Sequence, residues 1–108
     1  MKREDIPWPK GMLLICTKCG TYIPADELKN PKDVAEQIRD DFRTRLKKEG
    51  LHKNLRVLVS GCIDVCEVGT QAVAFVPGVE GEVEVLTLHP EKDREELFQK
   101  IMKRIQSK

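Results

Sequence analysis

Short apolar runs and two longer amphipathic segments divide the chain into six predicted elements. Residues 11–17 contain an apolar run that ends at Cys16. This run is too short for a core helix and is typical of a strand buried on both faces. Further strands are predicted at residues 55–60, 71–76 and 82–88. Residues 77–81 are rich in turn formers, so we expect the last two strands to form an antiparallel hairpin.

The amphipathic segments repeat apolar residues at helical spacing. The first helix is expected to begin at Asn30 and Pro31, a capping side chain followed by proline, and to end at Gly50. The second is expected to begin at His89 and Pro90. Their predicted buried faces consist of Val34, Ala35, Ile38, Phe42 and Leu46 in the first helix, and Leu97, Phe98, Ile101, Met102 and Ile105 in the second.

The resulting order is β-α-β followed by β-β-α, which predicts an α/β fold with one four-stranded mixed sheet. The first helix connects the first two strands as a crossover, so these strands should run parallel, with their carboxyl ends at the same edge of the sheet. Residues 11–108 are expected to form a single domain. Residues 1–10 are polar and carry two prolines around Trp8, which predicts an extended N-terminal arm anchored by Trp8 to the body or to a partner.

The four cysteines follow the two strands that are expected to be parallel. Cys16 ends the first strand and Cys19 comes shortly after it, while Cys62 and Cys66 follow the second strand. Open α/β sheets usually hold their ligands at this edge. The sequence therefore predicts that both pairs meet in one site.

Composition narrows the chemistry of that site. The chain has 108 residues, enough for one core, and its net charge of +1 does not support a nucleic-acid partner. The early apolar run at residues 12–16 is too short for a secretory signal or a membrane span, so we expect a cytoplasmic protein with reduced thiols and no membrane insertion. Cysteines in such a compartment indicate metal or redox chemistry, with two disulfides or four inert thiols as the alternative.

The residues in and around the second pair favour an iron–sulfur cluster over zinc. Two residues separate Cys16 from Cys19, a spacing common to zinc ribbons and some iron sites, and four thiolates can hold zinc or an iron–sulfur cluster. Three residues separate Cys62 from Cys66, with apolar neighbours and a glycine on either side. Glycine lets backbone N–H groups approach sulfur, which stabilises a negatively charged cluster. The apolar neighbours are Ile63, Val65 and Val68, and the glycines are Gly61 and Gly69.

Residues 61–69, Gly-Cys-Ile-Asp-Val-Cys-Glu-Val-Gly, and the strand at residues 72–77 resemble the thioredoxin-like [2Fe-2S] ferredoxins. They are also similar to the cluster domain of the small [2Fe-2S] subunit of respiratory complex I. The resemblance covers about residues 11–106 and implies a thioredoxin-like β-α-β-β-β-α fold. It implies that Cys62 and Cys66 ligate one iron and that Cys16 and Cys19 ligate the other. It further implies an electron carrier that is not an enzyme, is often a homodimer, and serves redox protein partners.

Two other functions stay open at this point. The family usually spaces its first cysteine pair much more widely, whereas here only Thr17 and Lys18 intervene, which keeps a structural zinc module as an alternative. The second alternative is a thiol–disulfide oxidoreductase that uses Cys16 and Cys19. Such a pair normally opens a helix, but a proline-bearing segment, residues 20–31, follows Cys19.

Charged and aromatic residues near the cysteines are candidates for docking a partner. Asp64 and Glu67 lie inside the second cysteine segment and form a candidate acidic rim, with a solvated surface as the simpler interpretation. Lys18 lies between the first two cysteines and is either a contact for a partner or simply exposed. Trp8 completes this set of candidates.

Overall fold

The computed structural model describes residues 1–5, 7–18, 23–62, 69–78 and 81–106. Within these ranges it contains the six expected elements and one short 3-10 helix, Ala25–Glu27. The strands are β1 (Gly11–Cys16), β2 (Leu55–Ser60), β3 (Gln71–Val76) and β4 (Glu84–Leu88), and the helices are α1 (Val34–Lys48) and α2 (Arg94–Gln106). The predicted α/β class and element order are therefore confirmed.

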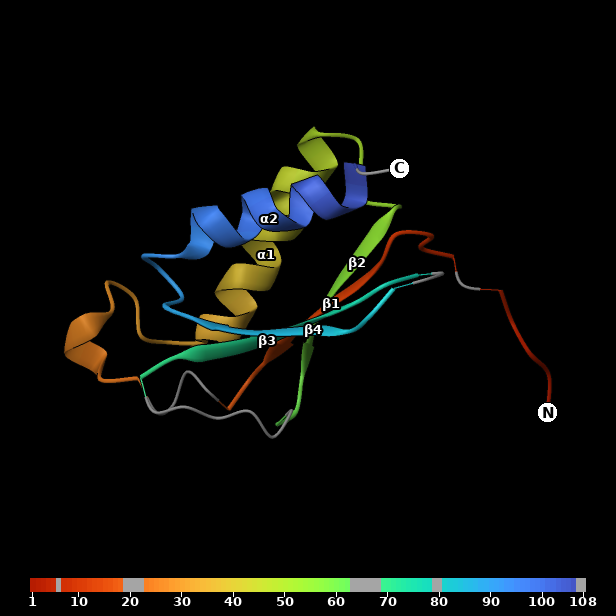
Figure 1. The fold of residues 1–108 in the computed structure, drawn as a ribbon. Helices are drawn as coiled ribbons and strands as arrows, with labels where there is room; N and C mark the ends of the chain where they lie inside the picture. The colour runs from red at the N-terminus through yellow and green to blue at the C-terminus, as the bar shows by residue number, and fades with distance from the viewer. Residues whose placement is uncertain (6, 19–22, 63–68, 79–80, 107–108) are drawn as a thin grey trace.

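The four strands form one mixed sheet in the order β2-β1-β3-β4 (Figure 1). β1 and β2 are parallel neighbours, as the crossover through α1 predicts, and their register pairs Gly11 with Leu55 and Cys16 with Ser60. β3 runs antiparallel to β1, and β4 runs antiparallel to β3, which confirms the predicted hairpin. The mixed sheet therefore places the end of β1 beside both the end of β2 and the beginning of β3.

Both helices lie on the same face of the sheet (Figure 1). The core forms between the helices and the side chains of the sheet that point toward them. The rings of Phe42 and Phe98 join the two helices edge to face, with their centroids 5.1 Å apart. The apolar faces predicted for the helices are all buried, and all their residues except Val34, which packs in a separate cluster with Ile23 and Leu28, lie in this core. The sheet contributes Leu13, Ile15, Leu55, Val57, Val73, Phe75 and Leu88 to it.

The first helix begins later than expected. Asn30 and Pro31 were predicted to start it, but α1 begins at Val34. Asp33 adopts a left-handed conformation with a φ of 52°, which a continuous right-handed helix does not allow. The Gln37 side chain instead reaches back and donates Nε2–H bonds to the carbonyl oxygens of Asn30 and Lys32. Gly50 does end the helical segment, in the left-handed region with a φ of +72°.

The second helix also begins later than expected. His89 and Pro90 were predicted to open it, but α2 begins at Arg94. A tight turn occupies the intervening residues, because the His89 N–H donates to the Asp93 carboxylate at 2.8 Å. The His89 ring closes the same turn, with Nδ1 accepting N–H bonds from Glu91 and Lys92. The last strand is likewise shorter than expected and begins at Glu84 instead of residue 82.

The N-terminal arm is attached to the sheet through its last residues. Trp8 is half-buried, and its carbonyl oxygen accepts an N–H bond from Gly11 at 3.1 Å. The Lys10 N–H donates to the Asn54 carbonyl oxygen at 2.8 Å, just before β2. Residues 1–5 are exposed, and the arm extends away from the sheet (Figure 1). Neither helix in the described ranges has the length and apolar character required to cross a membrane.

Candidate metal centre

The carboxyl ends of β1 and β2 are held together by hydrogen bonds beyond the last ladder pair. Thr17 follows β1, and its backbone N–H donates to the Ser60 carbonyl oxygen at 2.9 Å. The Thr17 hydroxyl donates to the same oxygen, also at 2.9 Å. Cys16 is the register partner of Ser60, and Cys62 comes two residues after Ser60. The parallel pair therefore brings one cysteine from each predicted pair to the same end of the sheet.

Cys16 lies in the interior of the molecule. Its exposed fraction is 0%, and it packs against Ala72 of β3 in a small apolar cluster. Its carbonyl oxygen accepts a hydrogen bond of 2.6 Å from the side chain of Gln71, the first residue of β3. The position of this cysteine is therefore fixed from two directions, by β2 through Thr17 and by β3 through Gln71.

Gln71 is a buried polar residue that the sequence analysis did not identify as part of the site. Its exposed fraction is 0%, and Nε2 donates to the carbonyl oxygens of Cys16 and Ala72. Both partners are acceptors, which fixes the orientation of the side-chain amide. Its Oε1 is buried without a hydrogen-bond donor among the described residues. The available signal was a glutamine at the head of an otherwise apolar strand, which indicates a buried amide with a specific partner.

Cys62 differs from Cys16 because it is exposed to solvent. It comes after the end of β2, where the Ser60 hydroxyl donates to the Gly61 carbonyl oxygen at 3.1 Å. The other two predicted ligands, Cys19 and Cys66, lie outside the described residues. Among the residues that the structure describes, no three or more His, Cys, Asp or Glu side chains form a group able to hold a metal, and this set contains only two of the four predicted ligands.

The return from the second cysteine segment requires a glycine. Gly69 has a φ of +88°, a left-handed conformation that residues with a side chain rarely adopt, and it directly precedes the approach to β3. Gly61, which was expected to allow a close backbone approach, meets no described atom within 4 Å of the position that a side chain would take. Of the two glycines around the second pair, only Gly69 adopts a backbone conformation that favours glycine in the described part of the chain.

The segment that follows the first cysteine pair is tied to the turn before α2. The Glu91 carboxylate accepts N–H bonds from Lys29 at 2.9 Å and from Asn30 at 3.1 Å. The bond from Lys29 is the main reason why the pKa of Glu91 lies below its usual value. A carboxylate on one side and two backbone donors on the other therefore connect parts of the chain that are about sixty residues apart.

The predicted docking residues are only partly placed by the structure. Lys18 is exposed beside the end of β1, and Trp8 is half-buried at the start of the sheet. Because β1 separates these two residues, Trp8 lies near the opposite end of the strand from Cys16. Asp64 and Glu67 lie outside the described residues. The structure thus brings Lys18, and not Trp8, next to the cysteine site.

Comparison with known proteins adds no assignment, since no family model, curated protein or solved structure matches this chain.

Proposed function

We propose that this chain is a one-electron carrier that holds a [2Fe-2S] cluster on Cys16, Cys19, Cys62 and Cys66. The proposed fold is thioredoxin-like, and the sheet order β2-β1-β3-β4 with a parallel first pair supports it. The proposal includes a cytoplasmic location and a redox protein as partner. It does not include a catalytic role.

One observation carries the proposal. The register pairs Cys16 with Ser60, so the strand ends that lead into the two cysteine pairs lie side by side. A separation of one ladder spacing, about 5 Å, is compatible with ligands of one small inorganic centre. Had β1 and β2 been separated by another strand, the two cysteine pairs would have started from distant positions.

The surroundings of Cys16 hold it in a fixed position, as a metal ligand requires. Cys16 is already buried and fixed by Gln71 and by the ladder to β2, so little order must be gained when a metal binds. The left-handed Gly69 turns the backbone at the return to β3. When bound, the cluster would supply reversible uptake of one electron.

The thiol–disulfide alternative is less well supported by the environment of Cys16. In that chemistry the first cysteine of the pair attacks as an accessible thiolate, usually at a helix N-terminus. Cys16 has an exposed fraction of 0%, and the first α-helix among the described residues after it begins at Val34. A structural zinc site shares the cysteine geometry, so metal analysis is needed to distinguish it from a cluster.

The proposal is tested by purifying the protein without oxygen and measuring its metals, its acid-labile sulfide and its visible spectrum. We expect a coloured protein with about two irons and two sulfides per chain, whose visible bands bleach on one-electron reduction. A colourless, iron-free protein containing one zinc per chain would instead establish the zinc module. Reduction of insulin by a variant that lacks Cys62 and Cys66 would establish the thiol–disulfide function.

Matched variants assign the ligands. Cys62→Ser should lose the spectrum of the native cluster, because a hydroxyl is a poorer ligand than a thiolate. Ser60→Ala is the control, since it changes a neighbouring polar side chain whose hydroxyl donates only to a local carbonyl oxygen in the described structure. Retention of full iron and an unchanged spectrum in Cys62→Ser would remove this residue from the ligand set.

A further inference from the structure

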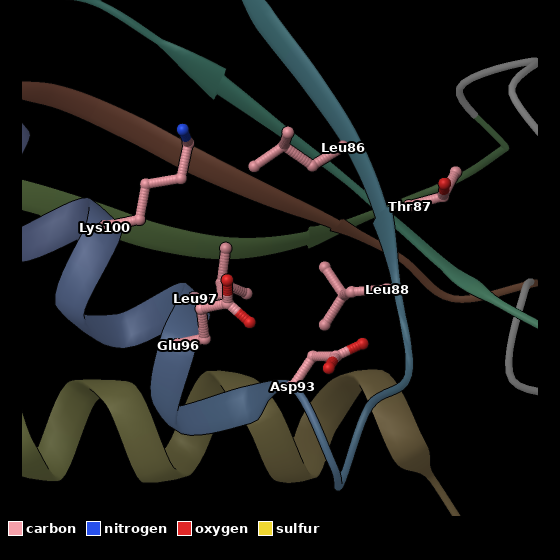
Figure 2. Close-up of a pocket in the computed structure, with 7 residues that line it drawn as sticks. All are labelled: Leu86, Thr87, Leu88, Asp93, Glu96, Leu97 and Lys100. Atoms are coloured by element: carbon pink, nitrogen blue, oxygen red, sulfur yellow. The ribbon is translucent and has the colours of Figure 1, made fainter.

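Gln71 occupies a position where an apolar side chain would be the ordinary choice. It is the first residue of β3, its exposed fraction is 0%, and Val73 and Phe75, which follow on the same face of the strand, belong to the core. Its register partner on β4 is Leu88, which lines the pocket between β4 and α2 (Figure 2). A buried amide costs free energy unless its polar atoms are hydrogen-bonded. The packing of the core therefore does not explain a glutamine at this position.

The amide of Gln71 uses only part of its hydrogen-bonding capacity in the described structure. Nε2 donates to the carbonyl oxygens of Cys16 at 2.6 Å and of Ala72 at 3.0 Å. Oε1 is buried without a donor among the described residues, which is unfavourable for the folded state. The amide is thus a poor means of stabilising the fold, and the shorter of its two bonds goes to a predicted metal ligand.

The bond from Gln71 completes a clamp on a single peptide unit. The register of β1 with β3 ends one position before Cys16, and the Gln71 side chain reaches the Cys16 carbonyl oxygen just beyond that point. The N–H of the same peptide unit belongs to Thr17 and donates to the Ser60 carbonyl oxygen of β2 at 2.9 Å. Both polar groups of this peptide are therefore bonded, one to β3 and the other to β2. A peptide plane held from both sides fixes the backbone at Cys16 and, with it, the direction of the Cα–Cβ bond.

The clamp acts from the face of the sheet opposite to the cysteine side chain. Side chains alternate along a strand, so Cys16 projects away from the face on which Ile15 joins the core, and it packs with Ala72 in a separate cluster. Gln71 precedes Ala72 and projects to the core face, so it reaches Cys16 through the carbonyl oxygen. The amide can therefore orient the cysteine without occupying the face that carries the sulfur.

We propose that Gln71 is a positioning residue of the metal centre, which orients Cys16 for metal binding and contributes more to metal affinity than to the stability of the fold. This inference rests on the proposed function, since it requires a metal on Cys16. Hydrogen bonds that orient ligating residues typically change metal affinity by about 10–100-fold when they are removed. Replacing the amide by an apolar side chain also removes the unpaired Oε1, so the cost to stability is smaller than the loss of two hydrogen bonds would suggest.

Cobalt(II) titration of the reduced, metal-free full chain tests this proposal. Cobalt(II) accepts thiolate ligands, and its visible bands report their number and geometry. We expect Gln71→Leu to bind cobalt about tenfold more weakly than wild type or weaker still, with altered visible bands. The titration is run at a temperature where far-UV circular dichroism shows each metal-free protein to be folded, so a change in the free energy of unfolding does not enter the affinity.

Gln37→Leu is the matched control. The Gln37 amide also donates to two backbone carbonyl oxygens, those of Asn30 and Lys32, and neither partner is a cysteine. We expect this variant to keep the cobalt affinity and the visible bands of the wild type. Gln71→Met, which has an unbranched side chain of similar length and no donor, is the second test variant if Gln71→Leu does not fold.

The possible outcomes separate this inference from the proposed function. Equal cobalt affinity and visible bands in the wild type and a folded Gln71 variant would overturn the inference and leave the metal centre intact. Equal losses in Gln71→Leu and Gln37→Leu would also overturn it, because the effect would not be specific to the contact with Cys16. Failure of both Gln71 variants to fold would show that the amide serves the fold, which again contradicts the proposal. A wild-type chain that binds no cobalt would overturn the metal centre and this inference together.

Discussion

The ends of β1 and β2 lie side by side, yet they present their cysteines in different ways. At the end of β1, Cys16 is fully buried, and its carbonyl oxygen accepts a hydrogen bond from Gln71. Thr17 then donates two hydrogen bonds to the neighbouring strand. Beyond the end of β2, Cys62 is exposed. One strand end thus delivers a cysteine as part of the core, and the other delivers it at the surface.

This difference separates two requirements of a metal site. A buried ligand is positioned by the same packing that stabilises the fold, so it restricts the geometry before any metal arrives. An exposed ligand leaves a path by which metal can enter and allows contact with a partner. We therefore expect changes on the β1 side to alter both stability and metal binding, and changes at Cys62 to alter metal binding with little effect on the stability of the metal-free protein.

The largest expected difference is between serine substitutions of the two cysteines in metal-free, reduced protein. Cys16→Ser buries a hydroxyl in an apolar cluster beside Ala72, and we expect a loss of about 1–3 kcal/mol in the free energy of unfolding. Cys62→Ser changes an exposed position and should stay within about 0.5 kcal/mol of wild type. Urea unfolding measures both values. Equal losses would contradict the distinction between the two strand ends.

The next effect concerns the hydrogen bond that holds Cys16 from β3. Gln71→Leu preserves much of the volume but removes the donor to the Cys16 carbonyl oxygen, and we expect a loss of about 1 kcal/mol in the free energy of unfolding. The simultaneous loss of the buried Oε1, which has no donor within the described structure, offsets part of the cost. If Gln71 also positions the cysteine, the reduction potential of the iron-loaded variant should shift, whereas an unchanged potential would restrict Gln71 to a structural role.

A smaller effect is expected at Thr17. Thr17→Val removes the hydroxyl bond to the Ser60 carbonyl oxygen but retains the backbone N–H bond to the same atom. Because one of the two links between the strand ends remains, we expect a loss of about 0.5–1 kcal/mol in the free energy of unfolding. Thr44→Val, which removes a hydroxyl bond within the exposed surface of α1, is a matched control. A larger loss for the control would mean that the Thr17 contact has no special importance.

The smallest effect is pH-dependent and lies farther along the segment that leaves β1. Hydrogen bonds from Lys29 and Asn30 lower the pKa of Glu91, so its contribution to stability is present above the unfolded carboxyl pKa of about 4.3. That contribution is lost as the pH falls through the lower pKa of the folded state. Glu91→Gln should therefore be slightly less stable than wild type at pH 7, and the difference should shrink toward pH 3. Thermal unfolding of both proteins across this pH range measures the difference. A difference in stability that stayed constant with pH would contradict a stabilising role for the Glu91 carboxylate.

The sequence predicted the sheet well because each strand has a strong local signal. The apolar runs gave β2 and β3 with their observed bounds, and the crossover argument gave the parallel pairing of β1 with β2. The helix starts were less predictable. Asn30 and Pro31 carry a capping signal, but the left-handed conformation of Asp33 delays the start of α1. His89 and Pro90 carry a similar signal, but a turn closed by Asp93 delays the start of α2. Both outcomes depend on side chains that bond the backbone several residues away.

The candidate site could be predicted only as a meeting of strand ends. Connectivity was enough to place Cys16 and Cys62 at one end of the sheet. The burial of Cys16 and its hydrogen bond from Gln71 depend on how β3 packs beside β1. The sequence next to either residue does not predict this packing.

The most direct test of a shared centre is X-ray absorption at the iron edge of the anaerobically purified protein. We expect each iron to have four sulfur neighbours and a second iron close by, and Cys16→Ser and Cys62→Ser each to lower the number of sulfur neighbours per iron or to lose the iron. Absorption only at the zinc edge, or an iron environment unchanged by either substitution, would contradict the claim that the ends of β1 and β2 together hold one cluster.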